Sequence, residues 1–247
     1  GDQRAATTDT TEPAAAADTS GNAGANLATG NTDHSAVVGS WGVGFFGVQD
    51  VPLCTDLPCG VAAGGNGAAA QQLSAPTIGV RYWLDSRFAI EAALGFATRS
   101  GSVENKVGGG MPQTYDDPSL TAFALHGAVP IALADSKHFT FEVIPELNFA
   151  VAGGSLRADT SSQDRSFSGN MIELGGRIGA EIHFGFISLP KLSLVGSLGL
   201  HLRSEHRNAE VADGSEHHTH NTFGITTSVG NKPWDVFVSN IAAIYYF

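Results

Sequence analysis

The sequence predicts an all-β fold, a transmembrane up-and-down antiparallel β-barrel of eight strands, with ten strands as the alternative. From residue 37 onward, apolar residues recur at every second position, which is the period of a β-strand. With 31 glycines in 247 residues and only 15% charged residues, the chain lacks the Leu, Lys and Glu content of a helical bundle. Short turns alternate with long Gly- and Asp-rich connections, as in a meander. The chain contains no run of 18 apolar residues, so no transmembrane helix is predicted.

Two regions differ in composition. Residues 1–36 contain Ala, Thr, Asp, Gly and Asn with almost no large apolar side chain, so they cannot bury enough surface to offset their ordering entropy. We therefore expect a disordered acidic N-terminal tail over residues 1–36 and a barrel over residues 37–247. The formal net charge of −11 argues against nucleic acid and against an anionic membrane surface as electrostatic partners.

The alternation defines eight segments, each about as long as a tilted membrane strand needs to be. They are residues 38–48, 77–84, 88–97, 121–131, 139–151, 172–184, 192–202 and 237–247. Between them, short turns are expected at 85–87, 134–137 and 188–190, and long loops at 49–72, 98–118, 153–170 and 204–234. Pro145 lies within a strand and predicts a bulge, because proline removes a hydrogen-bond donor from the ladder. Residues 222–230 could add further strand, which would raise the count to ten.

Three features indicate that the apolar face points outward into lipid. Across the eight strands that face carries no charged residue, whereas one Lys or Arg at the bilayer midplane would cost roughly 2–4 kcal/mol. The opposite face is mostly Gly, Ala and Ser, which suit the crowded interior of a narrow barrel. Aromatic residues gather where strands meet the short turns, as in an interfacial girdle. These are Tyr82, Phe88, Phe139, Phe141, Phe184, Phe186 and Tyr245.

The face opposite the apolar one also carries scattered charged side chains. They are Arg81, Glu91, Glu142, Glu146, Glu173, Arg177, Glu181, His183 and Arg203. Arg81 and Glu91 are equidistant from Ser86, so a tight hairpin places them directly opposite each other. Unpaired charges in a sealed interior are costly, so we expect a network of salt bridges that plugs the barrel. A narrow proton- or cation-selective path and a catalytic carboxylate pair are the alternatives.

Cys54 and Cys59 lie in a loop-like stretch and could close a small disulfide ring, contributing about 2 kcal/mol in an oxidising compartment. Free thiols are the alternative, and the absence of neighbouring ligands argues against a metal site there. The Gly42, Gly44 and Gly47 spacing matches a dinucleotide motif in spelling, but it lies within a strand and no helix follows. Strand glycines in a tight barrel explain it better.

A histidine-rich stretch falls in the last long loop. It contains His217, His218 and His220, with His206 and Glu216 nearby. Imidazoles at this spacing could hold Zn²⁺ or Cu²⁺, but a loop offers no fixed geometry, so we expect a hydrophilic surface loop instead. No metal site, cofactor or catalytic residue is predicted anywhere in the chain.

The chain ends in Ile-Tyr-Tyr-Phe, with aromatic Phe247 last and Tyr245 among the alternating residues before it. This ending resembles the C-terminal signature of bacterial outer-membrane β-barrels, and the strand count resembles the small OmpA/OmpX-type barrels. The resemblance implies a Gram-negative outer membrane, with lipid as one partner and the barrel-assembly machinery as another during biogenesis. It also implies extracellular long loops and a periplasmic N-terminus.

The function expected from these features is that of a non-enzymatic barrel with a plugged lumen. Such a barrel would act as a structural or interaction component of the cell envelope, contacting other envelope proteins through its loops or tail. One alternative is a narrow pore for small solutes. Another is a lipid-A-modifying enzyme, for which Ser204 and His206 form the candidate pair.

Overall fold

The computed structural model describes residues 32–53, 72–105, 113–156, 164–211, 214–226 and 241–247. Within them it contains ten β-strand segments and two short 3-10 turns. The strands are β1 (Trp41–Pro52), β2 (Gln72–Trp83), β3 (Ala89–Asn105), β4 (Gln113–Ala128), β5 (Ile131–Asp135), β6 (Phe139–Leu156), β7 (Arg165–Phe184), β8 (Leu189–Val211), β9 (Gly214–Thr226) and β10 (Ile241–Tyr246). The turns are η1 (His34–Ala36) and η2 (Gly185–Ile187).

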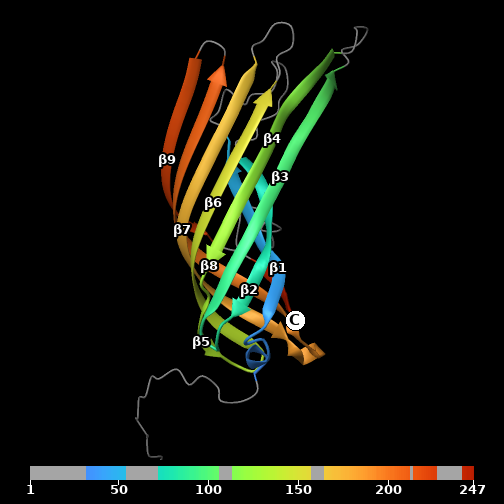
Figure 1. The fold of residues 1–247 in the computed structure, drawn as a ribbon, viewed down its shortest axis with the longest axis vertical. Helices are drawn as coiled ribbons and strands as arrows, with labels where there is room; N and C mark the ends of the chain where they lie inside the picture. The colour runs from blue at the N-terminus through green and yellow to red at the C-terminus, as the bar shows by residue number, and fades with distance from the viewer. Residues whose placement is uncertain (1–31, 54–71, 106–112, 157–163, 212–213, 227–240) are drawn as a thin grey trace, which may run out of the picture.

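Eight strands form a closed antiparallel ring, which confirms the predicted up-and-down barrel of eight strands (Figure 1). Around the ring the order is β10-β1-β2-β3-β4-β6-β7-β8, and β10 closes it by pairing with both β1 and β8. The other two strands, β5 and β9, have no ring position of their own. β9 pairs with the upper half of β8, from Gly199 to Val211, while β10 pairs with its lower half.

β4 and β5 together form one wall strand that is interrupted at Val129 and Pro130. Ala128 pairs with Glu146 and Ile131 with Val143, so the register against β6 is unchanged across the interruption. The bulge predicted at Pro145 is wrong, since Pro145 pairs with Gly176 without a register shift. The carbonyl of Pro145 accepts from the backbone N–H of Val129 at 3.0 Å, so the ring nitrogen of Pro145 faces the same neighbouring strand. The N–H that proline lacks is therefore missing at the interruption between β4 and β5.

Most of the predicted long loops that the structure describes are strand instead. β3 runs to Asn105, β6 to Leu156, and β8 and β9 continue the wall through residues 199–211 and 214–226. The prediction was wrong because the outward face of these extensions is mostly polar, so they lack the regular apolar alternation, while the backbone ladder continues. In Figure 1 these extensions form the tall upper wall of the barrel.

β1 bends into the barrel above its pairing with β10. The β1–β2 register shifts between Phe45 and Val48, and Gly47 adopts φ of 97°, a left-handed value that glycine accommodates without strain. Beyond this bend, Val51 and Leu53 are buried in an apolar cluster inside the upper barrel. The other members of the cluster include Leu73, Leu120, Ala122, Ala124, Ala150, Phe167 and Met171.

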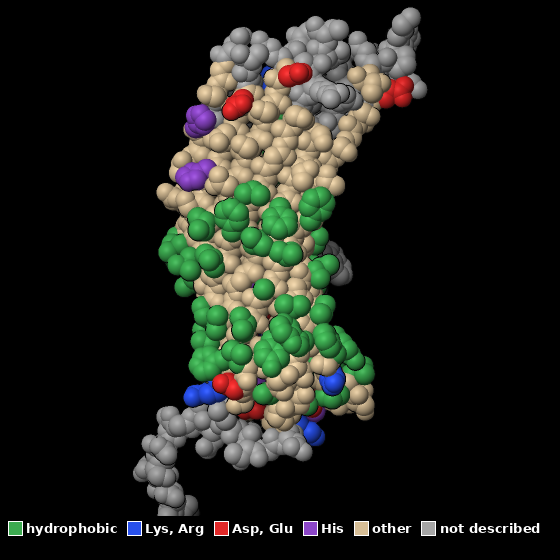
Figure 2. Space-filling view, viewed as in Figure 1, with side chains coloured by type: hydrophobic (Ala, Val, Ile, Leu, Met, Phe, Trp, Pro, Cys, Tyr) green, Lys and Arg blue, Asp and Glu red, His purple; other side chains and the backbone are tan. Residues whose placement is uncertain are grey.

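The outer surface of the barrel is apolar over its lower and middle parts (Figure 2). Large exposed hydrophobic residues occur on every ring strand, for example Ile78 at 64% exposure and Leu174 at 61%. Five of the predicted girdle aromatics are exposed, namely Phe88, Phe139, Phe141, Phe186 and Tyr245. Tyr82 stacks near Trp41 with ring centroids 4.8 Å apart. In the described part of the chain, no helix has the length and apolarity required to cross a membrane.

Residues 32–37, which we call the cap, lie against the lower end of the barrel (Figure 1). The predicted tail overlaps the described residues only at 32–36. There Thr32 donates to Asp135 at 2.9 Å, and the backbone N–H of Asp33 donates to Lys137 at 2.9 Å. His34 and Val37 are fully buried. The cap therefore packs against the barrel.

Candidate functional site: the polar interior

The candidate site is the polar network inside the barrel. Side chains alternate between the two faces of a strand, so outward Ile78 and Val80 place Thr77, Gly79 and Arg81 inward on β2. Small inward residues on β1–β3 leave room for the long side chains of the opposite strands. A Cβ on Gly44 would collide with the backbone oxygen of Ala243, and one on Gly79 with that of Ala92.

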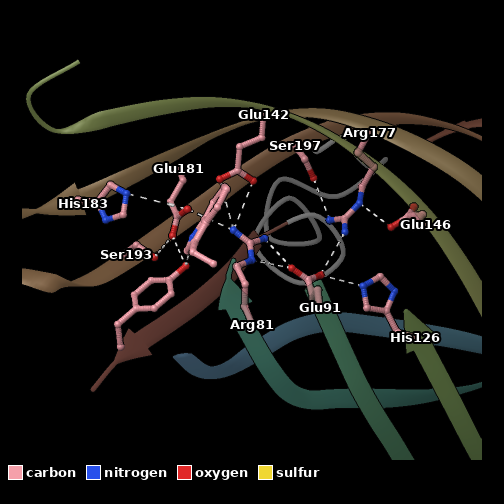
Figure 3. A network of polar contacts seen from close by, with 12 residues as sticks. Arg81, Glu91, His126, Glu142, Glu146, Arg177, Glu181, His183, Ser193 and Ser197 are labelled. Carbon is pink, nitrogen blue, oxygen red and sulfur yellow. Dashed lines mark hydrogen bonds and ion pairs between the residues drawn. The ribbon is translucent and has the colours of Figure 1, made fainter. Parts of the chain in front are cut away.

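Arg81 is the centre of the lower interior (Figure 3). It pairs in register with Glu91 across the β2–β3 hairpin, as the spacing around Ser86 predicts. Its guanidinium lies 2.6 Å from Glu91, 3.3 Å from Glu142 and 3.2 Å from Glu181. Arg81 and all three carboxylates are at most 2% exposed. One guanidinium therefore links β2, β3, β6 and β7 across the lumen.

Polar side chains that the sequence analysis did not single out complete this layer. Tyr246 donates to Glu181 at 2.9 Å, and the Trp83 indole donates to the Tyr246 hydroxyl at 3.1 Å. Ser193 also donates to Glu181. The alternation of the strands could have identified them, because each lies at an inward position. Trp83 and Tyr246 were missed because they are mainly apolar side chains.

A second chain of contacts leads upward from Glu91. His126 contacts Glu91 at 2.8 Å through Nε2 and Asn148 at 2.6 Å through Nδ1. Asn148 donates to Glu173 at 2.9 Å, and Arg203 donates to the other oxygen of Glu173 at 2.8 Å. His126 and Asn148 were not among the predicted network residues, although both occupy inward positions.

Two further groups join the network. Arg177 lies 2.6 Å from Glu146 and 3.7 Å from Glu91, which connects the lower layer with the wall at β6. Higher up, Glu205 lies 3.5 Å from Arg203 and 2.6 Å from Arg207. All nine predicted interior residues therefore belong to one connected network, with His183 at its lower edge, 3.9 Å from Glu181.

The lower mouth is closed by the cap. His34 donates to the backbone oxygen of Ser86 at 3.1 Å, and its ring lies edge-on to Trp83 at 4.4 Å. Asp33 contacts His138 at 2.6 Å and accepts from the backbone N–H of Gly185 at 3.1 Å. These contacts join the cap to all three short turns, β2–β3, β5–β6 and β7–β8.

A hollow with a volume of about 160 Å³ lies within the described interior. It lies above the Arg81 layer, where Phe46 stacks on His126 with centroids 6.5 Å apart. Charged groups of both signs line it, among them Asp50, Glu146, Glu173, Arg177 and Arg203. Among the described residues, this hollow is large enough for a small solute.

The other sequence candidates lie elsewhere. Ser204 and His206 are on the outer face of β8, where His206 contacts Thr219 at 3.0 Å rather than Ser204. His217, His218 and His220 lie on strand β9, which corrects the expected loop. Among the described residues, no group of three or more His, Cys, Asp or Glu side chains is arranged to hold a metal ion. Cys54 and Cys59 fall outside the described residues, so their disulfide stays a prediction.

The C-terminal residues lie at the closing seam. Tyr245 pairs with Val43 of β1 and Leu192 of β8, and the backbone N–H of Phe247 donates to Trp41 at 2.9 Å. Both aromatic side chains point outward and are more than half exposed.

Comparisons with known proteins find a structural similarity but no match in sequence. No protein-family model matches the chain, and no curated protein matches it. Among solved structures, a major outer membrane protein from Thermus thermophilus is similar, with a TM-score of 0.40 and 16% sequence identity. The similarity covers 84% of this chain and 98% of that one.

Proposed function

We propose that this chain is a non-enzymatic outer-membrane β-barrel with a closed interior. In this role it is a structural or interaction component of the cell envelope. Its upper hairpins and the residues that precede the cap are the parts available to partners. The observation that carries the proposal is the inverted distribution of side chains, with large apolar residues outside and the Arg81 network inside.

The outer surface supports membrane insertion. In a water-soluble protein the large apolar side chains gather inside and extended apolar patches are rare. Here they surround the barrel, and Arg81, Glu91, Glu142 and Glu181 are buried instead. Hydrocarbon stabilises this arrangement, because each exposed Leu or Phe side chain that leaves water contributes about 1.5–3 kcal/mol. Lipid is therefore the first proposed partner.

The interior supports a closed barrel. The cap covers the lower mouth, the Arg81 layer fills the section above it, and Val51, Leu53 and their apolar neighbours fill the upper section. Eight strands enclose a space that side chains can fill, and here they do so at three levels. We infer that the barrel does not conduct solutes.

The two ends of the barrel support an orientation. Short turns and the cap occupy one end, and tall hairpins occupy the other, as in barrels whose turns face the periplasm. We place the N-terminus in the periplasm and the hairpins outside the cell. The outward Tyr245 and Phe247 fit recognition by the barrel-assembly machinery during biogenesis.

Membrane insertion is tested by electrophoresis without and with boiling, after refolding into detergent micelles. A folded barrel resists the detergent and migrates differently from the boiled chain. We expect such heat-modifiable migration, together with aggregation in buffer that contains no amphiphile. A monomer that stays soluble in plain buffer would contradict the proposal.

The narrow pore is the second candidate function, because the 160 Å³ hollow is lined by charged groups. Single-channel recording in planar bilayers distinguishes the two. A closed barrel gives almost no conductance, and recording the Arg81→Ala variant beside it shows whether the Arg81 layer is the barrier. Defined conductance steps in the unaltered protein would favour the pore.

The interaction role is tested by affinity capture from envelope extracts with the full chain and with a chain that lacks residues 1–31. Recovery of no envelope protein by either would count against it. The enzymatic alternative is tested with Ser204→Ala, for which we expect unchanged masses of the cell's lipid A relative to cells with the unaltered protein.

A further inference from the structure

Uncharged polar side chains follow the upper edge of the apolar surface, and we call them the neutral belt. Along β7, β8 and β9 the large outward residues end at Ile172, Leu202 and Phe223. Above these residues and their counterparts on β3 and β4, the next outward positions are occupied by hydroxyl, amide and imidazole groups, and on β8 a carboxylate, Glu210, follows above them. The neutral belt comprises Thr98, Thr121, Ser168, Asn170, Ser204, His206, Asn208, His217, Thr219 and Asn221.

The neutral belt crosses β3, β4, β7, β8 and β9 and is interrupted on β6 by Gly153. Backbone pairing puts Thr98 beside Thr121, Thr121 beside Gly153 and Gly153 beside Ser168. The same row continues through Asn208 to His217. Neighbouring strands lie about 4.8 Å apart, so on β7, β8 and β9 successive side chains of this row are close enough to contact one ligand together.

The chemistry of the belt differs from that of a surface facing water. Surfaces of soluble proteins carry about 25–35% Lys, Arg, Asp and Glu, whereas the outward strand positions of β7, β8 and β9 above Ile172, Leu202 and Phe223 carry one such residue, Glu210. The upper outer wall in Figure 2 is accordingly mostly free of charged side chains until its top. Contacts within the belt hold its groups in place, since His206 lies 3.0 Å from Thr219 and His217 lies 2.8 Å from Asn208.

The lower edge of the apolar surface has the opposite character. Arg87, Lys137 and Lys191 are exposed at the short turns there together with Asp85, and Figure 2 shows basic and acidic side chains at that end. Basic residues beside an apolar surface attract anionic phospholipid headgroups, each contributing about 1 kcal/mol. The two edges are therefore built for headgroups of different chemistry.

We propose that the neutral belt binds the uncharged sugar headgroups of glycolipids in the leaflet that surrounds the upper edge. Sugar hydroxyls both donate and accept hydrogen bonds, as do the hydroxyl, amide and imidazole groups of the belt. The lack of Lys and Arg disfavours phosphate as the bound group. The position directly above the apolar surface selects a sugar attached to a lipid over a free one. This inference rests on the proposed membrane insertion.

The test measures the urea midpoint of unfolding by tryptophan fluorescence in three kinds of vesicle. These consist of phosphatidylcholine alone, phosphatidylcholine with phosphatidylglycerol, and phosphatidylcholine with digalactosyl diacylglycerol. The belt variant carries His206→Ala, Asn208→Ala and Thr219→Ala. The matched control carries Arg87→Ala, Lys137→Ala and Lys191→Ala at the lower edge. For each protein, we measure how far each lipid mixture shifts the urea midpoint from its value in phosphatidylcholine alone, and we compare these shifts between the proteins.

We expect the galactolipid to raise the urea midpoint of the unaltered protein and of the lower-edge control. In the belt variant most of this increase should be lost. The shift caused by phosphatidylglycerol should persist in the belt variant and be mostly lost in the lower-edge control. An equal galactolipid shift in the belt variant, or none in the unaltered protein, overturns the proposal. So does an equal shift from soluble digalactose, which would exclude the lipid-attached source. Failure to insert into any vesicle would instead overturn the proposed function.

Discussion

Arg81 holds together three carboxylates that come from three different strands. Removing one partner of a buried ion pair leaves uncompensated charge, which costs about 3–5 kcal/mol. We therefore expect Arg81→Met to lower the free energy of unfolding by that amount, measured by urea titration in lipid vesicles. Arg203→Met is the control, because Arg203 is 18% exposed beside Glu173 and its loss should cost less. Equal effects of the two substitutions would contradict the central role of Arg81.

Asp85 stabilises the β2–β3 turn outside the apolar surface. Backbone N–H donors of Arg87 and Phe88 hold the pKa of its carboxyl below the usual value. The folded state therefore favours the ionised form. Its contribution is complete above the unfolded pKa of about 3.9 and is lost as pH falls through the lower folded value.

The corresponding prediction concerns Asp85→Ala. The variant should unfold at lower urea concentration than the unaltered protein at pH 7, and the difference should shrink as the pH falls below about 4. Urea midpoints measured for both proteins across this pH range test it. A difference that stays constant with pH would show that the ionised carboxylate is not the cause.

At the residue scale, the sequence predicts the positions of the interior charges better than their partners. Alternation alone places Arg81 and Glu91 inward, and hairpin symmetry pairs them. Contacts such as that of Arg81 with Glu181, a hundred residues away, depend on how far the barrel wall is sheared. Local sequence contains no measure of that shear, so the inner partners could not be assigned.

At the scale of elements, the seam between β1 and β10 depends on glycine. Because a Cβ at Gly44 would collide with the backbone of Ala243, Gly44→Ala should force the two strands apart and destabilise the barrel by about 1–3 kcal/mol. Gly127→Ala is the matched control, since its Cβ would meet no atom within 4 Å. Unfolding in lipid vesicles measures both, and a similar loss for Gly127→Ala would contradict this account of the seam.

The side chain of Asp33 joins the cap to two turns, through His138 and Gly185. Loss of such charge-assisted hydrogen bonds costs about 1.5–3 kcal/mol, so Asp33→Ala should speed hydrogen exchange at the amides of Val37 and Gly39 about tenfold or more. Ser86→Ala serves as the control, because Ser86 contacts His34 through its backbone oxygen alone. Unchanged exchange in Asp33→Ala would mean that other contacts hold the cap.

Elements were predictable where they meet the apolar surface and unpredictable above it. Segments such as 172–184 show the alternation because one face is apolar and the other is not. In β9 the residues from His217 to Thr222 are polar on both faces, so nothing in the pattern distinguishes strand from loop. Similarly, Pro130 has no N–H donor and interrupts one predicted strand between β4 and β5, without changing its register against β6.

At the scale of the whole molecule, we expect the apolar section of the barrel to fold without the upper part of the wall. The Arg81 layer and the seam lie below the β8–β9 extension, so removing residues 207–218 and joining His206 to Thr219 through Asn-Gly should leave a folded barrel. Heat-modifiable migration measures this. Replacing Leu200, Leu202 and Phe223 with Ser in the full chain is the control and should impair insertion. Loss of the folded form on shortening alone would contradict separability.

The cap also sets an order of events. Asp33 and His34 are among the first residues of the described chain, yet Gly185, which binds Asp33, follows 152 positions later. The binding surface for the cap exists only after the β2–β3, β5–β6 and β7–β8 turns have come together at one end. Until these turns are in place Asp33 and His34 lack these partners, so the cap can dock only after most of the wall has formed.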